Sequence, residues 1–183
     1  MKRLLALAVC LGMANVAGAQ LAFEQFEGGT FPPTGWTVYD NVTTGGEVWN
    51  TIDYWNTMYT PWSTRYNFAS VGEAAMIDSD AIGSGATQDT ELWTPAFTVG
   101  AGDYLRFASN WNPYTYGNLE IGDVDISSDG GATWTNLLQL DGTATDWPSF
   151  KALDLSAYVG LSVIVRFHYY DASWAGHRQI HPV

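Results

Sequence analysis

The sequence predicts an all-β protein, an antiparallel β-sandwich of jelly-roll type, from three observations. Aromatic residues make up 15% of the 183 residues and charged residues only 14%, against roughly 25% charged residues in an average domain. Short stretches of alternating apolar and polar residues recur along the chain, the period of a strand with one buried face. Turn clusters rich in glycine and proline separate these stretches, and no convincing helical pattern lies between them.

The alternating stretches give the expected strands. The clearest runs from Val163 to Tyr170, and shorter ones surround Leu105 and Val124. The remaining strands are expected at Ala22–Phe26, Trp36–Tyr39, Glu47–Ile52, Ala74–Asp78, Leu92–Val99, Thr133–Leu140 and Phe150–Leu153. A single helical turn is expected at Asp154–Tyr158.

The first 19 residues have the pattern of a secretory signal peptide. Lys2 and Arg3 precede an apolar stretch from Leu4 to Met13 that is too short to span a bilayer, and the small residues 17–19 form a cleavage site. We therefore expect a secreted or cell-surface protein that is not inserted in the membrane after cleavage. Its single folded domain is expected to occupy residues 20–183.

The charge balance excludes one class of partner. The chain has 7 basic and 19 acidic residues and a formal net charge of −12, which becomes −14 when Lys2 and Arg3 leave with the signal peptide. Such a surface repels phosphate backbones, so we expect no nucleic acid. The only cysteine, Cys10, also leaves, so the mature domain must be stabilised by its core, by a metal, or by both.

Residues 127–134, Ser-Ser-Asp-Gly-Gly-Ala-Thr-Trp, form the most specific local motif, an Asp-box. We interpret it as a structural hairpin turn. Asp129 is expected to accept hydrogen bonds from backbone N–H groups, Gly131 to tolerate a positive φ, and Trp134 to pack beneath the turn. Asp-boxes are known from sialidases, but there they recur and lie away from the active site, whereas this chain has one.

A series of motifs stands in a specific order along the mature chain. It comprises Phe-Glu-Gly (26–28), Phe-Pro-Pro-Thr-Gly-Trp (31–36), Glu-Leu-Trp-Thr-Pro (91–95), Asp-Val-Asp-Ile-Ser (123–127), Asp-Leu-Ser-Ala-Tyr-Val-Gly (154–160) and Arg-Phe-His-Tyr-Tyr-Asp (166–171). Together these motifs resemble the cleaved-adhesin / choice-of-anchor J domains, relatives of the MAM-type jelly rolls. The resemblance implies an extracellular, non-catalytic module, of a kind often appended to secreted peptidases or surface adhesins. After Trp174 the sequence departs from the family pattern, which predicts a truncated chain with an incomplete last strand.

Calcium is the cofactor that the resemblance implies, because several family members bind it. Ca²⁺ takes about 6–8 oxygen ligands, and Asp78 and Asp80 stand at a strand end before a glycine-rich loop. Family members with a structural ion use the glutamate of the opening Phe-Glu motif, here Glu27, and an aspartate of the last strand. His181 stands in place of that aspartate and is a poor ligand for a hard cation. The candidate ligands are therefore Glu27, Asp78 and Asp80 in a damaged or differently built site; alternatively, Asp78 and Asp80 are solvated turn carboxylates.

Two loops rich in aromatic residues carry the binding hypothesis, because exposed flat rings stack on sugars. The candidate ligand-binding residues are Tyr54, Trp55, Trp62, Tyr66, Trp111, Tyr114 and Tyr116. The alternative is that these rings cover the ends of the sandwich as part of its core. The expected partner is an extracellular glycan or protein, and the sequence gives no indication of oligomeric state.

No catalytic site is predicted, since the sequence has no nucleophile elbow and no phosphate-binding loop. His177 and His181 have the i, i+4 spacing of zinc ligands on a helix but lack a His-Glu-x-x-His signature. Asp123 and Asp125 could form the carboxylate pair of a glycosidase, or simply a solvated face. We expect a non-catalytic, adhesin-like binding module; the alternatives are an ancillary domain of a secreted peptidase and a carbohydrate-active enzyme.

Overall fold

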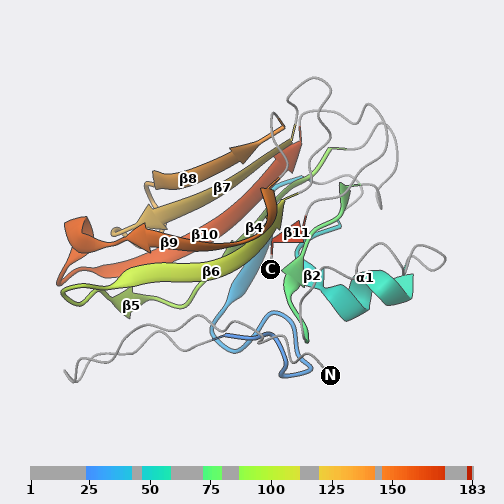
Figure 1. Ribbon diagram of the computed structural model, residues 1–183, viewed down its shortest axis with the longest axis horizontal. Coiled ribbons are helices and arrows are strands. Elements are labelled where there is room, and N and C mark those ends of the chain that lie inside the picture. Colours follow the sequence, from blue (N-terminus) through green and yellow to red (C-terminus); the bar gives the residue numbers. More distant parts are fainter. Residues whose placement is uncertain are drawn as a thin grey trace.

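The computed structural model describes residues 24–42, 47–58, 72–79, 87–111, 120–142, 146–171 and 181–182. Most of its strands lie in two antiparallel sheets, so the predicted all-β sandwich of jelly-roll type is confirmed (Figure 1). The segment 1–19, expected to be a signal peptide, lies outside the described residues. Within the described part of the chain, no helix is long and apolar enough to cross a membrane.

The larger sheet has six strands. They are ordered β1-β4-β10-β7-β8, with β5 paired to the start of β10, and every pairing is antiparallel. Its strands are β1 (Thr37–Asp40), β4 (Asp89–Trp93), β5 (Phe97–Thr98), β7 (Glu120–Ser127), β8 (Thr135–Asp141) and β10 (Ser162–Asp171). The longest strand, β10, therefore lies between β4 and β7 and pairs with β7 along most of its length and with β4 along half of it.

The smaller sheet has three strands in the order β11-β6-β9, and a separate pair joins β2 to β3. These strands are β2 (Asn50–Thr51), β3 (Ala75–Met76), β6 (Tyr104–Trp111), β9 (Asp146–Asp154) and β11 (His181–Pro182). Figure 1 shows β6 and β9 stacked over the larger sheet, and β2 at the end of the molecule where the helix lies.

Two clusters of buried side chains form the core. The cluster between the two sheets consists of Phe97, Val99, Leu105, Phe107, Val124, Ile126, Leu155, Val163 and Val165. The cluster beside the helix and the β2–β3 pair consists of Trp49, Ile52, Trp55, Ala74, Ala75, Met76, Ile77, Leu92, Trp111 and Tyr169. Burying so many large apolar side chains, at roughly 1.5–3 kcal/mol each, gives the domain a stabilising core without a disulfide.

Alternation along β10 divides its side chains between the core and the outer face of the larger sheet. Val165 and Tyr169 are 0% and 1% exposed, so this set points inward. Arg166 and His168 lie between them and point to the opposite face. The pairing register then places Arg166 between Trp93 of β4 and Asp125 of β7. The periodicity found in the sequence thus determines which side chains the outer face presents.

The expectation that the chain has no helix is wrong for residues Ile52–Met58, which form α1. Thr51, at the position before the helix, accepts a hydrogen bond at its Oγ1 from the backbone N–H of Tyr54 (3.2 Å), an N-cap that satisfies one free donor of the first turn. Ile52 and Trp55, three positions apart, are both buried. The strand expected at Glu47–Ile52 therefore shrinks to β2, and the expected aromatic loop begins as a helix.

Two other expected strands differ from the structure. The single strand expected at Leu92–Val99 is split into β4 and β5, because Pro95 lacks the N–H that a ladder needs. At Ala22–Phe26, residues 24–26 are not extended in a sheet, and residues 22 and 23 lie outside the described part. The helical turn expected near residue 156 is present as the 3-10 helix η2 (Ser156–Tyr158).

Candidate functional site

Two of the aromatic residues expected to bind a ligand belong to the core instead. Trp55 is 0% and Trp111 is 3% exposed. Their indole N–H groups donate to the backbone carbonyls of Met76 (3.1 Å) and Asp141 (2.8 Å). Enclosed rings cannot stack on a ligand, so the ligand-binding prediction is wrong for these two tryptophans.

The other predicted aromatic residues are distributed differently. Tyr54 is partly exposed, packs edge-on against Trp55 with ring centroids 5.3 Å apart, and donates its hydroxyl to Glu47 (3.1 Å). Burial and the neighbouring Glu47 carboxylate raise the pKa of the Tyr54 hydroxyl. The remaining candidates lie outside the described residues: Trp62, Tyr66, Tyr114 and Tyr116.

The Asp-box forms a closed network of hydrogen bonds at the turn between β7 and β8. The Asp129 carboxylate accepts from the backbone N–H of Thr133 (2.9 Å) and from its hydroxyl (2.6 Å), and the Ser127 hydroxyl donates to it as well (2.7 Å). The side-chain and backbone donors of Thr133, and then Ser127, lower the pKa of Asp129 to about 2. Gly131 has φ +93°, and a Cβ there would lie 2.5 Å from the ring of Trp93. The carboxylate is thus fully used within the turn.

The outer face of the larger sheet carries a concentrated set of charged side chains from three adjacent strands, which we call the acidic face. It consists of Asp89 and Glu91 on β4, Asp123 and Asp125 on β7, and Arg166 and His168 on β10. Arg166 is the centre of this set: its Nη1 lies 2.9 Å from Glu91 Oε1 and its Nε 2.8 Å from Asp125 Oδ2. Glu91 and Asp125 are only 7% and 4% exposed, so both ion pairs are largely shielded from water.

Amide side chains complete the hydrogen bonding of these carboxylates. Asn41 Nδ2 donates to Asp89 (2.9 Å) and Glu91 (3.0 Å). On the other side of β10, Asn136 Nδ2 lies 2.9 Å from an oxygen of each of the two β7 aspartates. Both oxygens of Glu91 are engaged, one by Arg166 and Asn41 and the other by the indole N–H of Trp93. Both oxygens of Asp125 are engaged as well, one by Arg166 and the other by Asn136. The inner pair of carboxylates is thus satisfied by the protein itself.

Aromatic rings border the acidic face but are packed against their neighbours. The guanidinium of Arg166 lies 4.4 Å from the ring centroid of Trp134, a cation–π contact. Trp93 packs edge-on against Trp134 at 4.8 Å and contacts Tyr39 at 4.5 Å. Tyr170 is packed against His168 at 4.9 Å. These contacts fix the rings in place and leave electrostatics as the main property of the face.

The acidic face also brings together side chains of the kinds that hold metal ions. Within the described residues, two groups bring three donor atoms within 4.8 Å of one another: Asp89, Glu91 and His168, and Asp123, Asp125 and His168. Each of the four carboxylates already accepts a hydrogen bond from the amide of Asn41 or Asn136, and Arg166 also binds Glu91 and Asp125. His168 Nε2 lies 2.7 Å from Asp89 Oδ1, so every residue of both groups has a partner within the face.

The calcium ligands expected from the sequence are not among these groups. Glu27 is exposed, and its Oε1 accepts from the backbone N–H of Glu73 (2.8 Å). Asp78 is 0% exposed, so it is not a solvated turn carboxylate. Neither residue falls in a three-donor group within the described part of the chain, and Asp80 lies outside it. A calcium site at these three residues stays a prediction.

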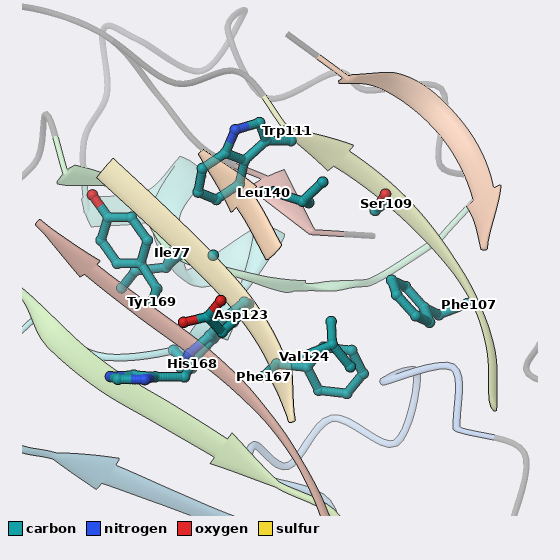
Figure 2. Close-up of a pocket in the computed structure, with 12 residues that line it drawn as sticks. Ile77, Phe107, Ser109, Trp111, Asp123, Val124, Leu140, Phe167, His168 and Tyr169 are labelled. Atoms are coloured by element: carbon teal, nitrogen blue, oxygen red, sulfur yellow. The ribbon is translucent and has the colours of Figure 1, made fainter. Parts of the chain in front are cut away.

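A small cavity lies under the acidic face, between the two sheets. It has a volume of about 30 Å³, and its walls are mostly the apolar side chains of Phe107, Trp111 and Leu140 (Figure 2). Ligand pockets are typically about 300–1,000 Å³, so this cavity is a packing gap. Figure 2 shows Asp123 and His168 close together and directed away from Trp111.

Tyr169 is a buried titratable group on the inner face of β10. Burial raises the pKa of its hydroxyl well above the ordinary value of 10, and the carboxylates of Glu120, Asp171 and Asp78 raise it further. In the unfolded chain the phenol ionises near pH 10, whereas in the folded protein it stays neutral to higher pH. Its contribution to stability is therefore complete below pH 10 and is lost as the pH rises from 10 through the folded pKa.

We expect Tyr169→Phe to flatten the alkaline loss of stability. Urea unfolding at about pH 9 and about pH 11 should show a smaller drop in the free energy of unfolding for this variant than for the wild type. All other tyrosines are common to both proteins, so the difference reports Tyr169 alone. Equal drops in both proteins would contradict the assigned burial effect.

The fold and the site together define an antiparallel β-sandwich with a charged outer sheet face. No protein-family model matches the chain, and no curated protein matches it. Among solved structures the chain is similar to the K1 cleaved adhesin domain of Lys-gingipain from Porphyromonas gingivalis W83, with a TM-score of 0.51 and 21% identity, covering 83% of this chain and 97% of that one.

The K3 cleaved adhesin domain of the same Lys-gingipain is similar to the same degree. It has a TM-score of 0.51 and 21% identity, and the match covers 81% of this chain and 85% of that domain. At this identity the likeness shows the fold alone. The chain therefore has a cleaved-adhesin-like fold, in agreement with the resemblance of its motifs.

Proposed function

We propose that the chain is a non-catalytic, adhesin-like module that recognises an extracellular partner through its acidic face. The observation that carries this proposal is the convergence of six charged side chains from β4, β7 and β10 on the outer face of the larger sheet. The core lies on the other side of these strands. The fold likeness to adhesin domains supports a binding role, and the signal-peptide pattern supports secretion.

The hypothesis of a carbohydrate-active enzyme is weaker than that of a binding module, because both carboxylate oxygens of Asp125 are already bound. A glycosidase nucleophile needs a free carboxylate oxygen directed into a substrate cleft. One oxygen of Asp125 binds Arg166 and the other binds Asn136. Its partner Asp123 shares that same amide, and a cavity of about 30 Å³ with Asp123 in its wall lies beneath the sheet. This geometry favours recognition over turnover.

A second candidate function is an ancillary domain of a secreted peptidase. The observation that favours it is that both similar structures are single domains of one larger protein, Lys-gingipain. The coding sequence adjoining this one decides between the two roles. An in-frame peptidase domain would support the ancillary role, and its absence would leave the independent module.

The binding role is tested with two variants that each remove two negative charges. The face variant is Asp89→Asn/Asp123→Asn, in which asparagine keeps a side-chain oxygen for the existing hydrogen bonds. The control variant is Asp53→Asn/Asp154→Asn, at exposed positions on α1 and β9 away from the face. Matching circular-dichroism melts of both variants with the wild type would show that the folds are intact.

The binding assay is biolayer interferometry on immobilised protein. The probes are mannan, xylan, fibronectin, fibrinogen and collagen. We expect at least one probe to bind the wild type and the control variant alike and to bind the face variant at least tenfold more weakly. Recognition through this face would be refuted if no probe bound at millimolar or saturating concentration. It would also be refuted if every probe that binds bound the face variant as tightly as the wild type.

Calcium stabilisation is a separate prediction, which rests on Glu27, Asp78 and Asp80. A ligand that binds only the folded state raises its stability by RT ln(1 + [L]/Kd), about 2.7 kcal/mol at a hundredfold excess over Kd. We expect thermal melts in millimolar Ca²⁺ to show a higher Tm than melts with a chelator, and Asp78→Asn to reduce that difference. An unchanged Tm would contradict calcium binding to the folded protein.

A further inference from the structure

We propose that the partner of the acidic face is a cationic polypeptide segment, whose lysine or arginine side chains bind Asp89 and Asp123 on either side of His168. This inference rests on the proposed function and specifies its ligand. It commits to a protein segment rather than a glycan or a metal ion.

The acidic face carries an excess of negative charge. Its four carboxylates are balanced by one guanidinium, that of Arg166, which leaves a formal charge of −3 when His168 is neutral. The whole chain is also acidic, with a net charge of −12. Fields of this sign speed the approach of positively charged partners and oppose negatively charged ones.

The outer carboxylates, those of Asp89 and Asp123, each keep one oxygen available for a ligand. Asp89 Oδ1 accepts from Asn41 and lies 2.7 Å from His168 Nε2, and Asp123 Oδ1 accepts from Asn136 and Gln139. Within the described part of the chain, Oδ2 of each aspartate has no hydrogen-bond donor. The side chain of Asp89 is 38% exposed. The face therefore offers two oriented acceptors, in contrast to the saturated Glu91 and Asp125.

The two acceptors stand on strands that are not adjacent. Asp89 lies on β4 and Asp123 on β7, and β10 separates the two strands. The backbones of β4 and β7 are thus roughly 9.6 Å apart, which is two strand spacings. In an extended segment, side chains on the same face recur about every 6.6 Å, so two basic side chains can each pair with one of the two aspartates. This arrangement fits a segment with at least two basic residues.

The packing of the aromatic rings argues against a glycan. Recognition of sugars by stacking needs a free ring face, but Arg166 covers Trp134 and the Asp-box glycine lies against Trp93. Tyr39 is 41% exposed yet tilts onto Trp93 at 4.5 Å. Charged groups, rather than stacking surfaces, dominate the open part of the face.

Fluorescence anisotropy with labelled peptides tests the inference directly. The probes are (Lys-Ser)₄ and (Glu-Ser)₄ peptides at about 150 mM salt, with mannan as an unlabelled competitor. We expect the wild type and the control variant to bind the lysine peptide within twofold of each other, and the face variant to bind it at least tenfold more weakly. The glutamate peptide should not bind, and added salt should weaken the lysine peptide.

Several results would overturn the inference. The first is that the lysine peptide does not bind. The second is an equal loss of peptide affinity in the face and control variants, which would indicate general charge attraction. The third is displacement of the peptide by mannan. If the lysine peptide fails while a macromolecule of the larger panel binds in a face-dependent way, the inference falls and the proposed function stands. If no probe depends on the face, both fall.

Discussion

Replacing Arg166 with methionine should lower the free energy of unfolding by about 3–5 kcal/mol, because it leaves two buried carboxylates without a counter-charge. The side chains of Glu91 and Asp125 are 9% and 6% exposed, and Arg166 binds both. The substitution also removes the cation–π contact with Trp134. For a domain of this size each kcal/mol shifts the Tm by about 2–4 °C, so thermal melts should show a fall of roughly 6–20 °C.

Two further variants separate the loss of charge pairing from the loss of packing. Arg166→Lys keeps the charge but lacks the fork that reaches both carboxylates, so an intermediate loss is expected. Adding Glu91→Gln and Asp125→Asn to Arg166→Met removes the unpaired charges and should recover part of the stability. A loss below about 1 kcal/mol in Arg166→Met would contradict the assigned ion-pair network.

Trp55→Ala should destabilise the protein by about 3–5 kcal/mol, the usual effect of removing a fully buried tryptophan. Trp55 is 0% exposed and packs in the cluster formed by α1 and the β2–β3 pair. The measurement is urea unfolding followed by circular dichroism. Tyr39→Ala, at a ring that is 41% exposed, serves as the control and should change the stability by about 1 kcal/mol or less.

The same pair of variants tests the corrected role of Trp55. If Trp55→Ala unfolded at the wild-type urea concentration but lost binding to a glycan, Trp55 would be a ligand platform rather than a core residue. We expect the opposite result: a large loss of stability, and no loss of ligand binding beyond the unfolded fraction.

Much of the fold could be predicted because burial on one side of a sheet leaves a two-residue period in the sequence. The alternation between Val163 and Tyr170 correctly marks β10, with Val165 and Tyr169 buried. The helix α1 was missed because its seven residues give only a short periodic pattern, with the i, i+3 apolar pairs Ile52/Trp55 and Trp55/Met58. Its detectable signal was Thr51 at the capping position, directly before that pattern.

The acidic face could be predicted only in part. Periodicity places Asp123 with Asp125 and Arg166 with His168 on common strand faces. It does not say which strands are neighbours: Arg166 is 75 positions from Glu91 and 41 from Asp125 along the chain. The order β4-β10-β7, a tertiary property of the sandwich, creates the site. For this reason the sequence pointed to aromatic loops, which are conspicuous locally, and missed the charged face.

Chemical-shift mapping of ¹⁵N-labelled protein titrated with the (Lys-Ser)₄ peptide tests the claim that the acidic face is the binding surface. The account predicts that the largest shifts fall on Asp89, Asp123, His168 and their neighbours on β4, β7 and β10. Shifts centred on the smaller sheet, around Phe150, which is 68% exposed on β9, or spread evenly over all exposed acidic residues would contradict it.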